Sequence, residues 1–353
     1  MRLFHTLTAV LLLVNQIDCN AFQKSPFGSI SLPNKLSQKQ LKKSLPEQTI
    51  LNNNGHVTPL PTRGGGSAKY ALPMVSFSEA PFQTSTVMFA AANTLGFIIS
   101  IFTGSHLHLD LLGTGAFTIA SIPGILAPSS LRVLLSSGAV AIWGTKLASF
   151  LFFRALKVKT DVRLDETLST TSGTASFWFI SFLWGVICSL PHTIGTTSTS
   201  AGNPITLAIG FAVYVLGLAT ETKADYQKWV FKKQNPGKFC NEGLWSISQH
   251  PNFFGNLLLW AGIYIMNIDG LIQPMNEGES ILSVLTGSWK AWVALLSPLF
   301  MWSLFYGQSS GAILSSVELA NKKYGSDVTY SEYIKNVPLI IPRIFDWLKK
   351  LFS

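Results

Sequence analysis

Residues 221–257 read ETKADYQKWVFKKQNPGKFCNEGLWSISQHPNFFGNL and carry most of the polar chemistry of this chain. Two apolar runs flank this stretch, Pro204–Thr220 before it and Leu257–Ile268 after it. The triplet Asn235-Pro236-Gly237 predicts a break in any helix that enters from the first run. A charged block between two apolar runs is typical of a membrane-surface loop that leads into the next span. The stretch therefore predicts a helical membrane protein.

The composition agrees with a membrane protein. Of the 353 residues, 48% are hydrophobic and only 12% are charged, whereas a soluble domain carries about 25% charged residues. About 20 apolar residues are needed to cross a hydrocarbon layer of ~30 Å. Seven stretches come close to that length, so we predict an all-α fold, a polytopic transmembrane helical bundle of about seven spans. The predicted spans are residues 84–103, 109–127, 131–153, 175–191, 203–220, 253–268 and 289–308.

Basic residues are distributed unevenly around the predicted spans. Fifteen Lys and Arg residues lie after the third span, after the fifth span and in the C-terminal tail, while the opposite side, counted from residue 79, has Arg132 and Lys290. Such a bias marks the cytosolic or stromal side of a membrane. The net charge of +9 is thus mostly a topology signal, and we expect the lipid bilayer as partner and no nucleic acid.

The N-terminus predicts a leader in two parts. Residues 1–21 have an apolar core at Leu7–Val14 and a small-residue end, which is the pattern of a signal peptide. Residues 22–78 contain one acid, Glu47, against seven bases and many hydroxyl residues, which is transit-peptide composition. The two parts together predict a plastid membrane of an alga with complex plastids, with the endoplasmic reticulum membrane as the alternative. The membrane domain is then residues 79–353.

The chain has three cysteines, Cys19, Cys188 and Cys240. Three thiols at these spacings make no disulfide framework. We interpret them as unpaired structural thiols.

The first part of the polar stretch predicts a helix that continues out of the fifth span. Its charged residues follow at i, i+4, i+7 and i+11, which places them on one helix face. These residues are Glu221, Asp225, Lys228 and Lys232. Two interpretations stay open: ion pairs on a solvated helix end, and one wall of a site for a phosphorylated cofactor.

A helix entry follows at His250-Pro251-Asn252. Pro251 fits the first turn of a helix, whose free backbone N–H groups favour an anion. His250 and Asn252 add side chains that can hydrogen-bond a nucleotide. We therefore predict a cofactor loop over residues 221–256. Its candidate cofactor-binding residues are Glu221, Asp225, Lys228, Lys232, His250 and Asn252.

Several motifs resemble the steroid 5-alpha-reductase-like membrane family, in its broad branch of uncharacterised members. The strongest are the Asp-x-x-Lys stretch at Asp225–Lys228 and the run Gly243-Leu244-Trp245 followed by His250-Pro251-Asn252-Phe253-Phe254-Gly255. Further similar blocks are residues 108–117, 143–148 and 161–166, Tyr330-x-x-Tyr333 and Ile341-Pro342. The resemblance covers roughly residues 84–345.

The resemblance implies a membrane-embedded, NADPH-dependent reductase. Members with known chemistry reduce a carbon–carbon double bond conjugated to a carbonyl, here in a lipophilic, sterol- or isoprenoid-like substrate. It places the cofactor between the Asp225–Lys232 segment and the turn at Asn252. The reaction asks for a hydride and for an acid or hydrogen-bond donor at the carbonyl oxygen. It needs no metal, and we predict no metal site.

The chain departs from the family pattern at three positions. Gln249 stands where Arg is usual, which removes a fixed positive charge from the predicted cofactor turn. Asn256 stands where Glu is usual. Lys146 replaces a common Arg, and the two cations differ if the Arg binds its partner in bidentate fashion. These departures leave the choice of NADPH open.

Two ions lie inside apolar runs, Asp110 near the start of the second span and Lys146 in the third. An ion within a membrane is costly and usually has a partner. We predict that Asp110 and Lys146 pair or jointly line the substrate pocket; the alternative is that each reaches its nearby interface alone.

Three residues are candidates for catalysis: Tyr226, Tyr264 and Asp110. Either tyrosine could protonate the product, although buried tyrosines more often serve packing.

Two other functions compete with the reductase. One is an S-adenosylmethionine-dependent membrane methyltransferase of the isoprenylcysteine type, which also has a His-Pro turn and a Tyr-x-x-Tyr…Ile-Pro ending. Those enzymes carry an Arg and an adjacent Glu-Glu pair before the final segment, whereas residues 315–319 offer one Glu and no upstream Arg. The other is a non-catalytic membrane scaffold that has kept the fold.

Overall fold

The structure is a computed structural model that describes residues 81–158, 168–272, 280–311 and 316–353. The predicted signal peptide, the transit-like leader and the 161–166 block lie outside these residues. Within them the chain forms helices and no strand, which confirms the all-α prediction.

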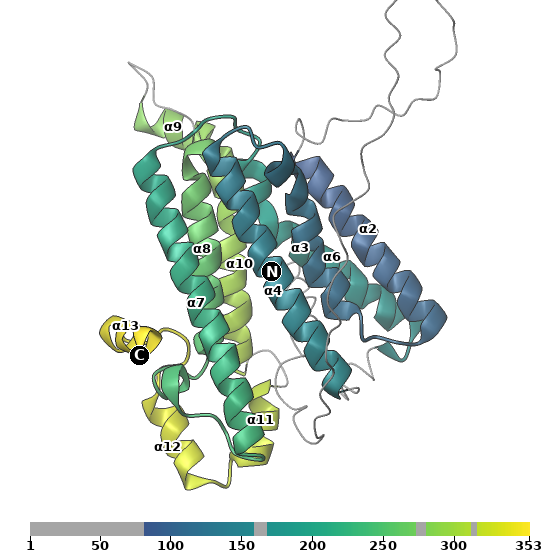
Figure 1. The fold of residues 1–353 in the computed structure, drawn as a ribbon, viewed down its shortest axis with the longest axis vertical. Helices are drawn as coiled ribbons and strands as arrows, with labels where there is room; N and C mark the ends of the chain where they lie inside the picture. The colour runs from purple at the N-terminus through teal and green to yellow at the C-terminus, as the bar shows by residue number, and fades with distance from the viewer. Residues whose placement is uncertain (1–80, 159–167, 273–279, 312–315) are drawn as a thin grey trace, which may run out of the picture. The chain divides into compact units, whose positions relative to one another are not determined.

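Five of the described helices are long and apolar enough to cross a membrane. They are α2 (Pro81–Thr103), α3 (Leu109–Leu126), α4 (Leu131–Val158), α6 (Thr171–Gly195) and α7 (Pro204–Gln234). The pair α9 (Ile281–Gly287) and α10 (Trp289–Ser309), bent by 63°, makes a sixth if it is one span. The prediction of a polytopic helical bundle is confirmed, and Figure 1 shows these helices packed together.

The predicted span at 253–268 corresponds to α8 (Pro251–Leu271), which is not among the five apolar helices. Three asparagines lower its average hydropathy, and two of them, Asn256 and Asn267, are buried inside the bundle. Because α8 packs against α6, α7 and α10, its polar side chains meet protein groups rather than lipid. A buried central helix does not need the apolar surface of a lipid-facing one.

α7 and α8 run antiparallel in close contact, side by side in Figure 1. Glycines on both helices permit this approach. A Cβ added at Gly262 would lie 2.7 Å from the carbonyl oxygen of Gly210, and one at Gly255 would lie 2.8 Å from that of Gly217. The match of 210 with 262 and of 217 with 255 fixes the register of the pair. Small residues at such contacts are the usual way that membrane helices pack backbone to backbone.

The two ends of the bundle differ, as the predicted topology requires. At one end Arg132 donates to the Gly195 carbonyl at 2.9 Å, and Lys290 donates to the Thr197 hydroxyl at 3.3 Å. Both bases predicted for the less basic side thus meet the chain at the C-terminal end of α6 and just after it. At the opposite end Lys223 donates to the Leu351 carbonyl at 2.9 Å.

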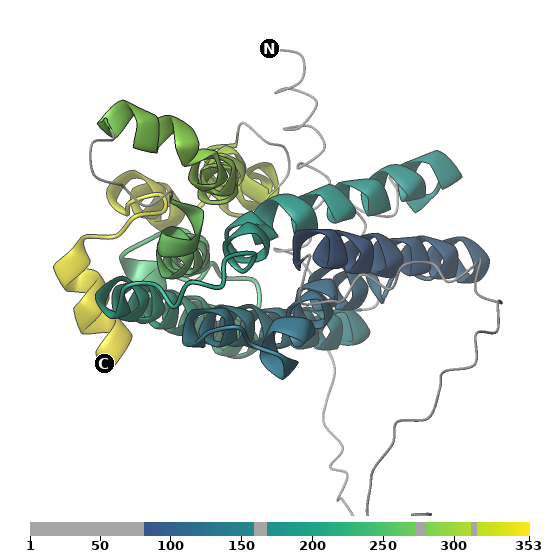
Figure 2. The same cartoon turned by 90° about the horizontal axis from the view of Figure 1, so that it is seen from above.

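Short elements cover this second, basic end. They are η1 (Gly243–Ser246), α11 (Ser316–Tyr324), α12 (Val328–Asn336) and α13 (Ile344–Phe352). The Trp245 ring nitrogen donates to the Ala224 carbonyl at 2.9 Å, and the Trp347 ring nitrogen donates to the Thr220 hydroxyl at 3.0 Å. These bonds tie η1 and α13 to α7. Figure 2 shows α13 and α2 on opposite sides of the helices between them.

An aromatic cluster joins four helices at the centre. The Phe117 ring of α3 lies 5.1 Å from Trp143 of α4 and 5.0 Å from Trp184 of α6. The Trp143 ring lies 5.1 Å from Trp260 of α8. Edge-to-face contacts of this kind add to the free energy gained by burial. Trp143 and Trp184 of this cluster also line a cavity between the helices.

The α7–α8 contact predicts that Gly262→Ala destabilises the protein. The added methyl group collides with the α7 backbone, and such overpacking costs about 1–3 kcal/mol. We expect a lower apparent Tm of the detergent-purified protein. Gly138→Ala is the matched control, because a Cβ at Gly138 meets nothing within 4 Å. An equal effect of the two substitutions would contradict the close packing.

Candidate functional site

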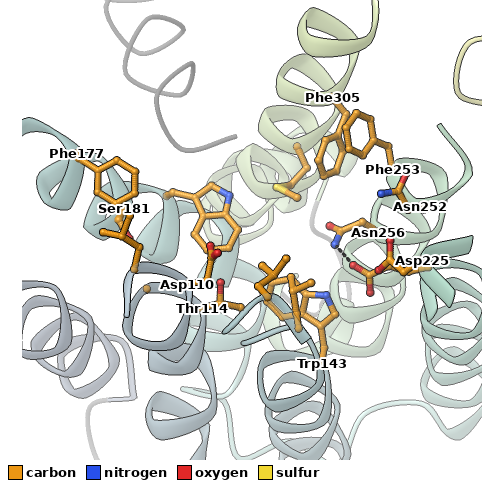
Figure 3. A pocket seen from close by; sticks show the side chains of 17 residues that line it. Asp110, Thr114, Trp143, Phe177, Ser181, Asp225, Asn252, Phe253, Asn256 and Phe305 are labelled. Carbon is orange, nitrogen blue, oxygen red and sulfur yellow. Dashed lines mark hydrogen bonds between the residues drawn. The ribbon is translucent and has the colours of Figure 1, made fainter. Parts of the chain in front are cut away.

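A cavity opens between the helices above the aromatic cluster, and we call it the bundle cavity (Figure 3). It holds about 800 Å³ of empty space including its mouth. Most of the wall is apolar, from Leu109, Leu147, Leu151, Phe177, Trp184, Met301 and Phe305. The polar part of the wall comes from Asp110, Thr114, Ser181, Glu221, Asp225, Asn252 and Asn256. Such a mixture suits a lipophilic ligand that carries a few polar groups.

A charged cluster stands at one side of the bundle cavity. The Lys146 ammonium lies 3.4 Å from a Glu221 carboxylate oxygen and 3.3 Å from an Asp225 carboxylate oxygen. The side chains are 22%, 5% and 15% exposed, so solvent screens the three charges only weakly. Lys146 thus neutralises part of the acidic charge that α7 brings to the cavity.

The predicted pairing of Asp110 with Lys146 is replaced by these two ion pairs. Asp110 lines the bundle cavity from α3, and the carboxylates that meet Lys146 come from α7. The sequence could not show this, because Lys146 and Glu221 are 75 positions apart and meet only through the packing of α4 against α7.

Asn256 extends the cluster. Its amide nitrogen donates to the other Glu221 carboxylate oxygen at 2.9 Å. The Asn256 oxygen is buried and has no hydrogen-bond partner in the structure. The ring nitrogen of Trp143 and the amide oxygen of Asn252, which belong to residues that line the cavity, are buried without a partner as well. Buried polar atoms normally find a partner, so these three atoms point to a ligand or ordered water.

A second hollow lies at the basic end of α7, and we call it the basic cleft. It encloses about 940 Å³ including its opening. Lys228 and Lys232 of α7 supply its positive charge. Aromatic rings make up much of the remaining wall, from Phe239, Trp245, Tyr324, Tyr330 and Tyr333. The Lys228 ammonium lies 4.5 Å from the centre of the Trp245 ring, and the Lys232 ammonium donates to the Tyr324 hydroxyl at 2.8 Å.

The bundle cavity and the basic cleft share a wall. His250 lines the cleft and stacks on Phe253, with ring centres 4.9 Å apart. Phe253 lines the cavity and stacks on Phe305 at 4.4 Å. On α7, Asp225 of the cavity is one turn from Lys228 of the cleft. The stacked rings of His250 and Phe253 therefore separate the cleft from the cavity.

The structure brings most of the predicted cofactor residues together. Glu221, Asp225, Lys228 and Lys232 share one face of α7, with the first two at the cavity and the last two at the cleft. The predicted helix break is confirmed, since α7 ends at Gln234. Pro251 begins α8 as predicted, so that His250 faces the cleft and Asn252 the cavity.

The two candidate tyrosines do not reach either space. Tyr226 is 66% exposed and lines neither the cavity nor the cleft. Tyr264 donates to the Ala291 carbonyl at 3.3 Å and packs among apolar residues of α6 and α10. Helix phase explains Tyr226, which follows Asp225 by one residue and so points about 100° away from it. Of the three candidate catalytic residues, Asp110 alone lines the cavity.

The departures at positions 249 and 256 have local structural roles. The Gln249 amide donates to the carbonyls of Ile334 at 3.0 Å and Val337 at 2.7 Å, which fixes the end of α12 against the turn before α8. Its backbone N–H also donates to the Pro338 carbonyl at 2.9 Å. Asn256 supplies an N–H to Glu221, where a second carboxylate would repel it.

Trp143 and the cleft aromatics were not identified as site residues from the sequence. Trp143 belongs to a block that resembles the family, but its spacing alone does not distinguish a core tryptophan from one that lines a cavity. Tyr330 and Tyr333 form the Tyr-x-x-Tyr motif, to which the sequence assigned no role in the site. The Tyr333 hydroxyl donates to the Trp245 carbonyl at 2.7 Å, and burial raises the pKa of Tyr333, so this phenol stays protonated.

In the part of the chain that the structure describes, no group of three or more His, Cys, Asp or Glu residues could hold a metal ion. The arrangement is thus a basic, aromatic cleft beside an apolar cavity with a polar side. The site lies in a helical bundle with five or six helices that could cross a membrane. The protein is therefore a multi-pass membrane protein.

Residues 96–337 match the family described as "Protein of unknown function (DUF1295)". This match covers well over half of the chain, so the protein belongs to that family, which is related to steroid 5-alpha-reductase-like proteins.

A shorter similarity links the chain to a curated protein, "Probable O-methyltransferase ustE" of Ustilaginoidea virens. The two are 35% identical over 72 residues, which is 20% of this chain and 25% of the relative. The chain therefore matches about a quarter of that relative's length. No solved structure matches the chain.

The charged cluster predicts that Lys146→Met destabilises the protein. The change leaves Glu221 and Asp225 without their counter-charge, and loss of one partner of a buried pair costs about 3 kcal/mol or more. We expect a lower apparent Tm, restored by adding Glu221→Gln and Asp225→Asn. In a separate variant, exchanging the two charges (Asp110→Lys with Lys146→Asp) should not restore the Tm lost on reversing the charge of Lys146 alone. Full stability of Lys146→Met alone would contradict the importance of the cluster.

The burial of Cys240 predicts that its thiol is alkylated slowly. Burial raises the pKa of this thiol, and the nearby Lys228 and Lys232 oppose the shift only in part. A raised folded-state pKa favours the neutral thiol, so the folded protein loses stability relative to the unfolded one as pH rises through the ordinary thiol range. We expect iodoacetamide to alkylate Cys240 at pH 8 more slowly than a free thiol, measured by mass spectrometry. A rate equal to that of a free thiol would contradict this environment.

Proposed function

We propose that the protein is a membrane-embedded, NADPH-dependent reductase of a carbon–carbon double bond in a lipophilic, sterol- or isoprenoid-like substrate. The observation that carries the proposal is the shared wall between the basic cleft and the bundle cavity at His250, Phe253 and Phe305. A cofactor held in the cleft would extend its nicotinamide past this wall into the cavity and meet the substrate there. The resemblance to steroid 5-alpha-reductase-like proteins implies a cofactor between the Asp225–Lys232 segment and Asn252, and these residues border both the cleft and the cavity.

The residues of the cleft fit a phosphorylated dinucleotide. Lys228 and Lys232 provide ammonium groups for phosphates, and the rings of Trp245 and Tyr324 offer faces for a base. His250, at the N-cap of α8, lies where backbone N–H groups favour an anion. When bound, NADPH would supply the hydride.

The bundle cavity fits the substrate. Its apolar wall would hold a lipophilic body and keep water from the reacting bond. Thr114 and Ser181, on the α3 and α6 side, offer hydroxyl donors for a carbonyl oxygen. Asp110 lies on the same side. Because Tyr226 and Tyr264 do not line the cavity, Asp110 is the remaining candidate for the proton donor.

A second candidate is an S-adenosylmethionine-dependent methyltransferase. The similarity to a probable O-methyltransferase favours it, and the aromatic rings of the cleft could face a sulfonium cation. Two lysines in the same cleft oppose a cationic cofactor and favour a polyanionic one, so we rank the reductase first.

The leader composition supports a plastid membrane as the location, with the endoplasmic reticulum membrane as the alternative. Imaging of the full chain fused at its C-terminus to a fluorescent protein separates the two.

The cofactor is tested by titrating the detergent-purified full chain with NADPH, NADH and S-adenosylmethionine while the apparent Tm is followed. A ligand that binds the native state selectively stabilises it by about 2.7 kcal/mol at a hundredfold excess over Kd. We expect NADPH to raise the Tm and the double variant Lys228→Ala/Lys232→Ala to weaken its binding at least tenfold. Lys233→Ala is the matched control, since this exposed lysine of α7 does not line the cleft.

A Tm response to S-adenosylmethionine alone would assign the protein to the methyltransferases. No response to any of the three, in a sample that is folded by circular dichroism, would overturn both enzymatic functions in favour of the scaffold.

A further inference from the structure

The α8 wall of the bundle cavity presents a hydrogen-bond acceptor in a fixed orientation. An asparagine amide can be turned either way, and its neighbours decide which. The Asn256 nitrogen donates to Glu221 at 2.9 Å, and a carboxylate can only accept there. The Asn256 oxygen must therefore face elsewhere, and it is buried without a partner.

The α4 wall presents a donor. The Trp143 side chain is fully buried, and its ring nitrogen has no hydrogen-bond partner. An indole nitrogen can donate but cannot accept. The Trp143 ring packs on Trp260, one helical turn beyond Asn256 on α8. Figure 3 shows the Trp143 nitrogen and the Asn256 amide facing the same part of the cavity.

The charge around these two atoms argues against an anionic ligand. Glu221 and Asp225 line the cavity beside Asn256, and Asp110 lines it from α3. Lys146 supplies one positive charge to this group. A carboxylate ligand would add a further negative charge at short range in a poorly solvated space, where repulsion is strong.

We propose that this wall recognises a hydroxyl group on the lipophilic substrate, an alcohol or a phenol. One hydroxyl oxygen accepts from the Trp143 ring nitrogen while its proton is donated to the Asn256 oxygen. An ether or ketone oxygen satisfies the donor and leaves the acceptor without a partner. The inference rests on the proposed use of the bundle cavity for a lipophilic substrate, and not on the choice between hydride and methyl transfer.

The test compares matched probes without any cofactor. Three scaffolds, dodecyl, farnesyl and cholesteryl, are each used as the free alcohol, the methyl ether and a carboxylic acid of the same chain or ring system. Binding to the full chain in detergent is read from the concentration dependence of the apparent Tm. We expect at least one scaffold to bind as the alcohol about tenfold more tightly than as the ether, because a buried acceptor without a partner costs about that factor. The acid should bind more weakly still.

Two variants separate the two hydrogen bonds. Asn256→Leu removes the acceptor, so alcohol binding should fall to the level of the ether while ether binding stays unchanged. Trp143→Phe removes the donor, so both should weaken together and their ratio should persist. Trp260→Phe is the matched control, since Trp260 is equally buried, packs on Trp143 and does not line the cavity.

The wild-type comparison stands even if a variant does not fold. Equal binding of alcohol and ether on every scaffold that binds would overturn the proposal and indicate a bridging water in place of a hydroxyl. So would the absence of binding by all three scaffolds. Either result can occur while the NADPH titration still succeeds, so failure of this inference is distinguishable from failure of the reductase function.

Discussion

The close packing of α7 against α8 is the contact on which the candidate site depends. Gly210 and Gly217 face Gly262 and Gly255, and their missing side chains allow the two backbones to approach. In this register Glu221 meets Asn256, although 35 positions separate them. A looser contact would separate the polar wall of the bundle cavity from the basic end of α7. The fold and the site are thus held by the same helix pair.

Ions inside a membrane protein need partners, and here three helices supply them. Lys146 of α4 meets two carboxylates of α7, and Asn256 of α8 satisfies one of these carboxylates. Lys146 and Asn256, the residues at two positions where the chain departs from the family pattern, contact Glu221 from two sides. A neutral amide at 256 keeps a second carboxylate away from Glu221 and leaves its own oxygen toward the cavity. These two departures therefore form one local arrangement.

The division into a basic cleft and an apolar cavity explains why one stretch of sequence contains so much polar chemistry. Its N-terminal half runs along α7, where successive turns pass from the cavity at Asp225 to the cleft at Lys228. Its C-terminal half enters α8, where His250 faces the cleft and Asn252 the cavity. The stretch thus borders both spaces twice, and the stacked rings of His250 and Phe253 lie between them.

The sequence by itself determined the helical membrane class, the α7 face, the helix break after Gln234 and the helix start at Pro251. These features depend on composition, on the 3.6-residue period and on the backbone limits of proline, all of which are local. Tertiary structure alone decided that Lys146 pairs with Glu221 and Asp225, that Trp143 lines a cavity, and that Tyr226 and Tyr264 do not. Those outcomes depend on how the helices rotate and pack against one another, and no single helix encodes that in its own periodicity.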